Sequence, residues 1–457
     1  MSKEMQGGGL RRSLSVADVV LITVSGVTPA SSLFVIAPFA IHSAGSGAFL
    51  SFTLAAMLAL MYALCYAELG AAHPNAGGEY VIVQRLFGKL AGLQMYLFVL
   101  CLLLFVPAVL ATGAVAYLNT ALGTHLDSAT AALCVVLLCY AIGVLDIKFN
   151  AMVTGLFLCL EMLVLLVIAV LGFGQPHQPV SVLLNPVMPD AHGALMVAPV
   201  AAVAATIGSA VFSYNGFGGA IYLAEDMRET GRPMARAVMV TLVIVVLVEL
   251  LPLTALLLGA PSLAEVARQP DPISYVVSQL GSPLLARVIS GGIFLSVFNA
   301  IIALVLQSSR FLYASGRDRL WPPAMNRALV RIHPRFGTPW IATLLFALPS
   351  GLLTFSSNLE ELTSFTVIVI LLTYLIMAVC ALISRRREDV HHPYIMPWWP
   401  LPALLAIFGT LYTLWAILQD APPRDWLIIL GIASAGLLLG RYQRQDPLLT
   451  PSQQEES

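Results

Sequence analysis

The sequence predicts an all-α integral membrane protein with twelve transmembrane helices, and three observations support this fold class. Hydrophobic residues make up 59% of the 457-residue chain and charged residues only 10%, with a mean hydropathy of +0.88. Soluble domains carry about 25% charged residues, so lipid is the natural solvent for a chain this apolar. The apolar residues fall into long runs, and the basic residues are concentrated in alternate connections between those runs.

The apolar runs were identified on the basis that a helix needs about 20 apolar residues to cross a bilayer. Scanning the chain in this way gives twelve runs: 15–41, 48–72, 90–118, 129–147, 151–173, 197–223, 235–259, 286–314, 338–355, 361–384, 397–418 and 425–440. The segments between them contain Pro, Gly and charged residues, as loops do. The connection 260–285 is predicted to hold a surface helix, and the polar tails 1–14 and 441–457 are expected to be disordered.

The orientation follows from the placement of Lys and Arg, because positively charged loops stay in the cytoplasm. With the N-terminus inside, the tails and the even-numbered loops contain all but Arg268, Arg287 and Arg424 of the 23 basic residues. The sequence therefore predicts a multi-pass protein of the plasma (inner) membrane with both termini cytoplasmic.

Several classes of function lack the residues that they require. The net charge is −1 and the charges are scattered, so we expect no nucleic-acid partner. The six cysteines lie in apolar runs without a CxxC pair, so neither a disulfide framework nor a metal site is expected. Intramembrane hydrolysis would need a Ser/His pair, two aspartates or HExxH within the spans, and an ATP-driven pump would need a Walker motif. We expect no enzyme activity and no cofactor.

Two apolar runs contain residues that break helices. In the first run, SGVTPASS (25–32) combines Gly26 and Pro29 with the hydroxyls of Thr28, Ser31 and Ser32. In the sixth run, FSYNGFGG (212–219) contains three glycines and Asn215. Unpaired backbone groups cost several kcal/mol in hydrocarbon, so such breaks survive only where they line a cavity or bind something.

The two breaks open two successive sets of five runs, and interrupted helices at corresponding positions of two halves point to the central site of a transporter. Helix N-termini offer N–H groups to an anion, and helix C-termini offer carbonyls to a cation. A zwitterion such as an amino acid presents both charges. The alternative is that the glycines only let helices pack closely.

Three motifs in the order of the chain resemble the amino acid–polyamine–organocation (APC) permease superfamily. After the second run, Pro74, Gly77, Gly78, Tyr80, Arg85 and Gly88 resemble its P-x-x-G-G-x-Y element. The segment 212–238 resembles its sixth-span motif, an aromatic-rich break followed by an acidic pair and a basic-proline turn. The segment 310–323, followed by His333 and Pro339, resembles its R-x-x-Y-x-x-x-R-D motif.

The resemblance implies a LeuT-type inverted five-plus-five repeat, with repeats at 15–173 and 197–384 and peripheral helices eleven and twelve at 397–440. It implies alternating access around a midplane site. The expected substrate-binding residues are Gly26, Thr28, Ser31, Ser32, Phe212, Tyr214, Asn215, Gly216 and Gly218. Relatives place an aromatic that closes over the substrate at the position of Phe212, although packing is the more common role of a single phenylalanine. Glu225, Asp226 and Arg228 are expected to form an inner gate, with a solvated loop cluster as the alternative.

The sequence departs from the family pattern at two positions. Relatives carry a glycine-rich first break whose N–H groups hold a carboxylate, whereas Pro29 has no N–H to give. Many relatives place a lysine in the fifth span, where this chain has Glu161. An ionisable side chain deep in a span is a functional candidate. Glu161 could couple transport to protons, pair with a substrate amine, or make a structural hydrogen bond, and position alone leaves all three open.

The sequence predicts a secondary transporter of a small amino acid, coupled to protons through Glu161. The alternative is an exchanger or importer of an amine or polyamine that does not require an α-carboxylate. Sodium coupling would need ligands such as Ser296 and Asn299. A sensor on the same fold would be favoured by long tails, and a channel by a continuous polar stripe. The tails here are short, and the polar residues cluster at the two breaks.

Overall fold

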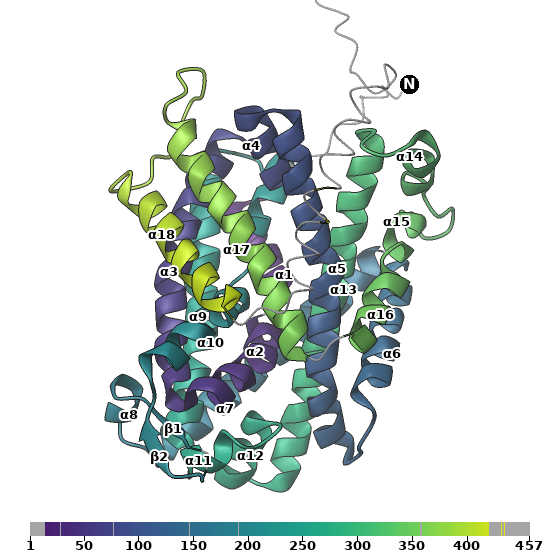
Figure 1. The fold of residues 1–457 in the computed structure, drawn as a ribbon. Helices are drawn as coiled ribbons and strands as arrows, with labels where there is room; N and C mark the ends of the chain where they lie inside the picture. Colours follow the sequence, from purple (N-terminus) through teal and green to yellow (C-terminus); the bar gives the residue numbers. More distant parts are fainter. Residues whose placement is uncertain are drawn as a thin grey trace, which may run out of the picture.

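Long apolar helices run from one end of the molecule to the other in the computed structural model (Figure 1). The structure describes residues 14–27, 29–75, 77–145, 147–190, 192–356, 359–419, 431 and 434, without the side chains of 30–32, 147–154, 225, 226 and 356. Within these residues, eight segments are long and apolar enough to cross a membrane. They are Leu33–Ala72, Lys89–Leu122, Gly155–Gly174, Val200–Ala224, Arg232–Gly259, Pro283–Arg317, Leu359–Ser384 and Leu401–Leu418.

Most predicted runs correspond to one helix each. These helices are α3 (Ala48–Ala72), α5 (Lys89–Leu122), α6 (Ser128–Gly143), α7 (Ile147–Gly174), α10 (Arg232–Gly259), α13 (Pro283–Arg317), α17 (Leu359–Ser384) and α18 (Leu401–Leu418). The run 338–355 is divided into α15 (Trp340–Leu344) and α16 (Ala347–Ser356). The last run, 425–440, lies almost wholly outside the described residues, as do most of both tails. The all-helical prediction is confirmed, whereas the count of twelve spans and the inverted repeat stay predictions.

The first and sixth runs are each interrupted, as their glycines and prolines predict. The first run forms α1 (Val16–Val27) and α2 (Pro29–Ala44). The sixth forms α9 (Val200–Ser213) and the 3₁₀ helix η2 (Phe217–Asp226). A 3₁₀ segment of ten residues is unusually long, and such stretches often mark a hinge or a strained sequence.

Helices α7 and α10 pack against each other, and α10 also packs against α1 and α3. The backbones of α7 and α10 touch, because a Cβ on Gly172 would lie 2.1 Å from the carbonyl oxygen of Ala255. Small residues allow such close approach between helices in a membrane. This contact fixes the spacing of two helices that each carry a buried carboxyl group, Glu161 and Glu249.

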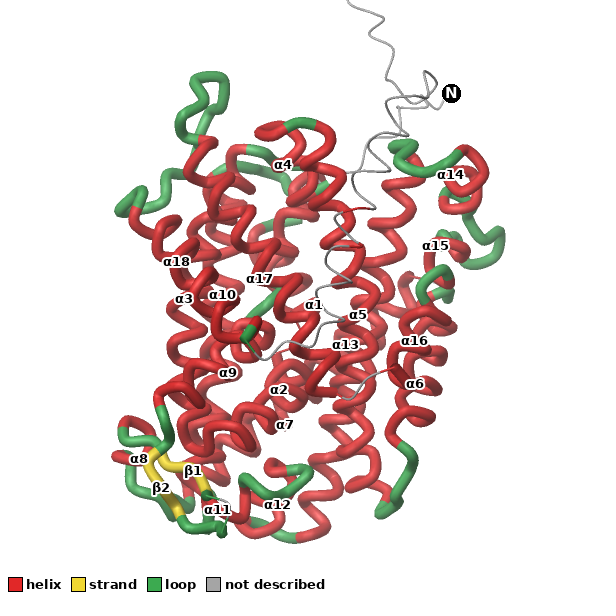
Figure 2. Tube along the Cα trace, in the orientation of Figure 1, coloured by secondary structure: helices red, strands yellow, loops and turns green. Residues whose placement is uncertain are grey.

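The end of the bundle opposite α4 (Gly78–Phe87) contains structure that the sequence did not predict. After α7, the chain forms α8 (Ser181–Leu184) and an antiparallel pair of strands, β1 (Val187–Pro189) and β2 (Leu195–Val197) (Figure 2). Ser46, in the 3₁₀ helix η1 (Gly45–Gly47), accepts from the backbone N–H of Val187 at 2.9 Å. Strands of three residues are too short to give a periodic pattern.

The connection 260–285 contains α11 (Leu263–Val266) and α12 (Pro272–Leu280). The prediction of a helix here is confirmed, but α12 is not a simple surface helix. One face of it is buried, including Ile273, Val276 and Val277, and it packs against α13.

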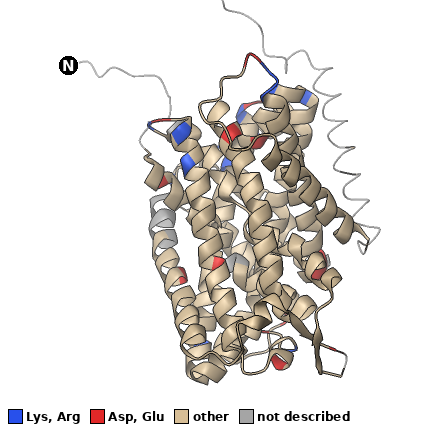
Figure 3. Cartoon of the chain, turned by 90° about the vertical axis from the view of Figure 1, so that its left-hand side faces the viewer, with Lys and Arg blue, Asp and Glu red and all other residues tan. Residues whose placement is uncertain are grey.

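Most of the described Lys and Arg residues gather at one end of the bundle (Figure 3). This end, called the basic end below, includes α4, α14 (Pro323–Leu329) and the connection from α17 to α18. Arg268 and Arg287 lie near the other end, beside α11 and at the start of α13. The charge asymmetry read from the sequence is therefore an asymmetry of the folded molecule.

Candidate functional site

The breaks of the first and sixth runs lie in direct contact. A Cβ on Gly216 would lie 2.9 Å from Cγ2 of Val27, the last residue of α1. A Cβ on Gly219 would lie 3.8 Å from Cγ2 of Thr23, one turn earlier in α1. Two segments nearly 190 residues apart in sequence (27 and 216) thus meet inside the bundle.

Glycine is required at the break after α9. Gly216 has φ +117°, a conformation that side-chain-bearing L-residues rarely adopt. The turn is held by two backbone hydrogen bonds, from the N–H of Asn215 to the carbonyl of Phe212 at 3.0 Å and from Gly219 to Gly216 at 2.8 Å. The helix ends here because the chain reverses its local handedness at Gly216.

Asn215 is held by a tyrosine that the sequence analysis did not single out. The Tyr374 hydroxyl of α17 donates to Asn215 Oδ1 at 2.6 Å. The Tyr374 ring lies 4.4 Å from that of Tyr62 and 5.8 Å from that of Phe217. Buried tyrosines usually find a partner for their hydroxyl, so a tyrosine in an apolar run was the available signal. The cluster joins η2 to α3 and α17.

The predicted substrate residues on the sixth run differ in accessibility. Asn215 and Gly216 are partly exposed, whereas Phe212 and Tyr214 are buried. Phe212 is only 4% exposed, so in this conformation its ring packs in the core instead of presenting a free face. The Cβ position of Gly218 lies 2.5 Å from the Tyr66 ring, so this glycine makes room for an aromatic side chain.

The predicted residues on the first run are only partly visible. A Cβ on Gly26 would lie 2.8 Å from Nε2 of Gln307, which brings an amide of α13 to the first break. Thr28 and the side chains of Ser31 and Ser32 lie outside the described residues. Gln307 was not predicted, and a lone glutamine inside an apolar run was the signal that could have revealed it.

Besides Glu68 near the end of α3, two carboxyl groups in the described spans are fully buried. Glu161 of α7 and Glu249 of α10 are both 0% exposed. The Ser213 hydroxyl, at the last residue of α9, donates to Glu249 Oε2 at 2.5 Å. The charge of Glu161 acts on Glu249. Glu249 was not among the predicted site residues, although its depth in an apolar run was the same signal that selected Glu161.

The predicted inner-gate residues lie at the basic end, after η2. The side chains of Glu225 and Asp226 are outside the described residues. The backbone N–H of Arg228 donates to the carbonyl of Leu14 at 3.0 Å, and the charge of Arg228 acts on Asp18 in the first turn of α1. The segment after η2 is therefore attached to the start of α1.

Two of the motifs quoted above meet at the basic end. The Tyr80 hydroxyl donates to Asp318 Oδ2 at 3.0 Å, joining the segment after α3 to the end of α13. The neighbouring Glu79 is buried and accepts from the Tyr222 hydroxyl of η2. Burial raises the pKa of Glu79 above its usual 4.5. Through these hydrogen bonds, Tyr80 connects α4 to the end of α13, and Glu79 connects α4 to η2.

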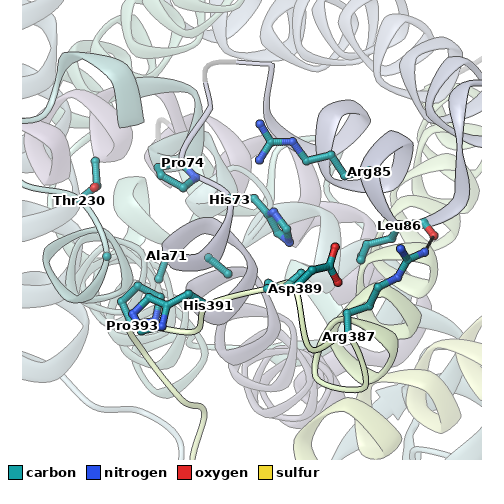
Figure 4. A pocket seen from close by; sticks show the side chains of 13 residues that line it. Ala71, His73, Pro74, Arg85, Leu86, Thr230, Arg387, Asp389, His391 and Pro393 are labelled. Carbon is teal, nitrogen blue, oxygen red and sulfur yellow. Dashed lines mark hydrogen bonds between the residues drawn. The ribbon is translucent and has the colours of Figure 1, made fainter. Parts of the chain in front are cut away.

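A cavity of about 530 Å³ opens at the basic end (Figure 4). Its lining includes His73, Arg85, Arg387 and Asp389, and burial, with the nearby charge of Arg85, lowers the pKa of His73 to about 4. No residue of either break lines it. The cavity is therefore separate from the contact between Val27 and Gly216.

Comparison with known proteins identifies the family. The family model described as amino acid permease matches residues 14–432. The chain belongs to the amino acid permease family. This confirms the resemblance read from the three motifs. Together with the eight apolar helices, membership indicates a multi-pass membrane protein of a transporter family.

Individual relatives of this permease are named for different substrates. Branched-chain amino acid permease BcaP of Bacillus subtilis (strain 168) is 25% identical over 426 residues, covering 88% of this chain and 87% of BcaP. The methylthioribose transporter of the same organism is 22% identical over 482 residues, covering 98% and 97%. Serine/threonine exchanger SteT, also of Bacillus subtilis (strain 168), is 24% identical over 411 residues, covering 87% of this chain and 89% of SteT. The relatives are similar to this permease along most of their length.

Proposed function

We propose that this permease is a secondary active transporter that moves a small amino acid across the plasma membrane by alternating access, coupled to protons. The basic end faces the cytoplasm and both termini are cytoplasmic, because positively charged loops stay inside. The segments 15–173 and 197–384 are the two repeats, and 397–440 forms the peripheral helices. The relatives named as amino acid permeases and exchangers support this substrate class.

One observation carries the proposal, the contact between the two breaks at Val27 and Gly216. There α9 ends at Ser213, so the last carbonyls of α9 have no intrahelical partner and can accept from a substrate ammonium group. Helix α2 begins at Pro29, and the N–H groups of its first turn can donate to a carboxylate. Asn215, held by Tyr374, adds an oriented amide beside Gly216.

The remaining predicted residues take supporting roles in this proposal. Gly26, Thr28, Ser31 and Ser32 complete the first break, and Phe212, Tyr214 and Gly218 shape the second. Glu161 is the coupling residue. Glu225, Asp226 and Arg228 form the inner gate, which the electrostatic contact between Arg228 and Asp18 supports.

A second candidate is an exchanger or importer of an amine or polyamine. Buried Glu249, which accepts from Ser213 at the sixth-run break, favours it, because a carboxyl group there would attract a cation without requiring a carboxylate on the substrate. The relative named as a methylthioribose transporter also supports a substrate other than an amino acid.

The two candidates are separated by a thermal-shift screen of the purified protein in detergent. Each amino acid is tested beside its decarboxylated amine and its N-acetylated form, together with polyamines. A ligand at 100 times its Kd stabilises by about 2.7 kcal/mol, which such an assay detects. We expect shifts only from compounds with both α-amino and α-carboxyl groups, followed by uptake of the same compounds into liposomes. Shifts from amines alone would establish the second candidate. Absence of both shift and uptake would refute both.

A further inference from the structure

Two buried carboxyl groups lie on helices that touch, and one of them acts electrostatically on the other. Glu161 and Glu249 are fully buried on α7 and α10, and these helices touch through their backbones at Gly172 and Gly259. The Cβ position of Gly259 lies 2.8 Å from the Cα of Gly172. Helices in such close contact cannot separate easily, so the two carboxyl groups stay near each other through the motions of neighbouring segments.

Two titratable groups of the described residues act on Glu249. The electrostatic partners of Glu249 are Glu161 on α7 and Tyr214 at the end of α9. The other charged residues of α7, α10 and the helices packed against them lie toward helix ends in the sequence: Asp18, His42, Glu68, Lys148, Glu225, Asp226, Arg232, Arg236, Arg287, Arg310 and Arg317. The uncharged titratable residues there are Tyr62, Tyr66, Cys65, Cys159, Tyr222, Tyr275 and Tyr313. Of the side chains that the structure describes, only that of Ser213 hydrogen-bonds to Glu249.

Ser213 connects the pair to the break. Its hydroxyl donates to Glu249 Oε2, and the next three residues are the turn Tyr214–Asn215–Gly216. Within the described residues, Glu249 Oε1 has no hydrogen-bond partner, so this oxygen has room to carry a proton. A carboxylate accepts a stronger hydrogen bond than the neutral acid does. The protonation state of Glu249 therefore sets how firmly Ser213 is held.

We propose that Glu161 and Glu249 form one proton-binding unit, and that Ser213 transmits its protonation state to the break at 214–216. This inference rests on the proposed proton-coupled transport. Two carboxylates in one buried site do not both ionise, so the unit alternates between one bound proton and two. One proton passes from water to a carboxylate oxygen on loading and returns to water on release, and no other covalent bond changes.

The coupling follows from charge and from hydrogen bonding. With two protons the unit is neutral, and a zwitterionic substrate adds no net charge, so the loaded carrier can occlude without a buried net charge. Protonation of Glu249 also weakens its bond with Ser213 and frees the turn at 214–216 to close on the substrate. With one proton the unit is anionic, and the buried net charge disfavours occlusion. The Glu249 carboxylate then keeps its strong hydrogen bond from Ser213.

The first test follows the pair directly and needs no substrate. Infrared difference spectra of the purified protein record the carbonyl stretch of buried protonated carboxyl groups as pH is changed. We expect a one-proton step in the wild type and its loss in the double variant Glu161→Gln/Glu249→Gln. Each single substitution should keep a one-proton step but change its midpoint, because the acid that shares the site with the remaining carboxyl group is replaced by an amide. Glu265→Gln, at an exposed carboxyl group near the opposite end, should leave the step unchanged.

The second test measures coupling as uptake of a mixture of labelled protein amino acids into liposomes under a pH gradient. The double variant should lose gradient-driven uptake. Ser213→Ala should keep the infrared step but decrease gradient-driven uptake at least tenfold. Ser213→Thr keeps a hydroxyl and should therefore retain gradient-driven uptake. A merely structural role of Ser213 would not separate these two readouts.

Distinct results would overturn each part. If Glu249→Gln leaves both the infrared step and the uptake at wild-type values, Glu161 acts alone and the pair is refuted. If Ser213→Ala keeps full gradient-driven uptake, the link to the break is refuted. Wild-type uptake that ignores the pH gradient would overturn coupling by the pair. Absence of any amino acid uptake would instead refute the proposed function, while the infrared step would still support the pair.

Discussion

Replacing Gly216 with alanine should disable transport while leaving the protein folded in the membrane. The alanine would have to adopt φ +117°, which costs about 1–3 kcal/mol for a residue with a side chain. Its Cβ would also lie 2.9 Å from Val27 Cγ2, and moving that valine off its rotamer costs about 0.5–1.5 kcal/mol. The total of about 1.5–4.5 kcal/mol falls on the turn of the proposed site, and it corresponds to a loss of about 10-fold to 2000-fold.

The assay is initial uptake into liposomes, normalised to the amount of folded protein measured by size-exclusion chromatography. Gly219→Ala is the matched control, because its Cβ would meet Thr23 only at 3.8 Å and its φ is not positive. We expect uptake near wild type for this control. Adding Val27→Ala to the Gly216→Ala variant should restore only the part of the loss that comes from crowding. Wild-type uptake by Gly216→Ala would refute the argument that this turn forms the site.

Three further substitutions test one contact at the break and two buried carboxyl groups near the basic end. Tyr374→Phe removes the hydroxyl that donates a hydrogen bond to Asn215 Oδ1 at 2.6 Å. The loss of this bond costs about 1 kcal/mol, so the affinity for the transported substrate should fall about fivefold without loss of folded protein. Glu68→Gln breaks the buried ion pair in which Arg385 donates to both carboxylate oxygens of Glu68. This change should destabilise the fold by about 3–5 kcal/mol and lower the melting temperature in detergent. The control Glu388→Gln changes an exposed carboxyl group and should melt like the wild type. Because burial raises the pKa of Glu79 above 4.5, the folded state holds a proton that the unfolded state releases, so stability should fall as pH rises through the folded pKa. Glu79→Gln should flatten the fall of the melting temperature as pH rises above 4.5, and an unchanged slope would show that another group is responsible.

The positions of the helix breaks could be predicted from the sequence because their causes are local. Gly216 and Pro29 act on the backbone of their own segments, through a positive φ and a missing N–H. The apolar runs are also local, which is why most of them correspond to observed helices. The basic residues indicated which connections would share an end of the bundle, and Figure 3 shows them gathered there.

The partners of the break could not be predicted because they come from distant segments. Tyr374 reaches Asn215 across 159 residues of sequence, and Glu249 reaches Ser213 across 36. A lone tyrosine or glutamate in an apolar run shows that some polar partner is needed, but it does not identify that partner. The β1–β2 pairing was missed for a related reason, because three residues per strand leave no pattern to read.

The structure also changes the meaning of the departure at the first break. From the sequence, Pro29 counted against recognition of a carboxylate because it has no N–H. In the structure Pro29 is the first residue of α2, a position where the N–H has no intrahelical partner in any case and where the fixed φ of proline suits the helix. The following N–H groups of the first turn remain unpaired by the helix and close to its positive end. The loss of one donor at this position therefore does not count against the proposed carboxylate site. On this reasoning Pro29 is compatible with the proposed amino acid substrate, and it gives no reason to prefer an amine alone.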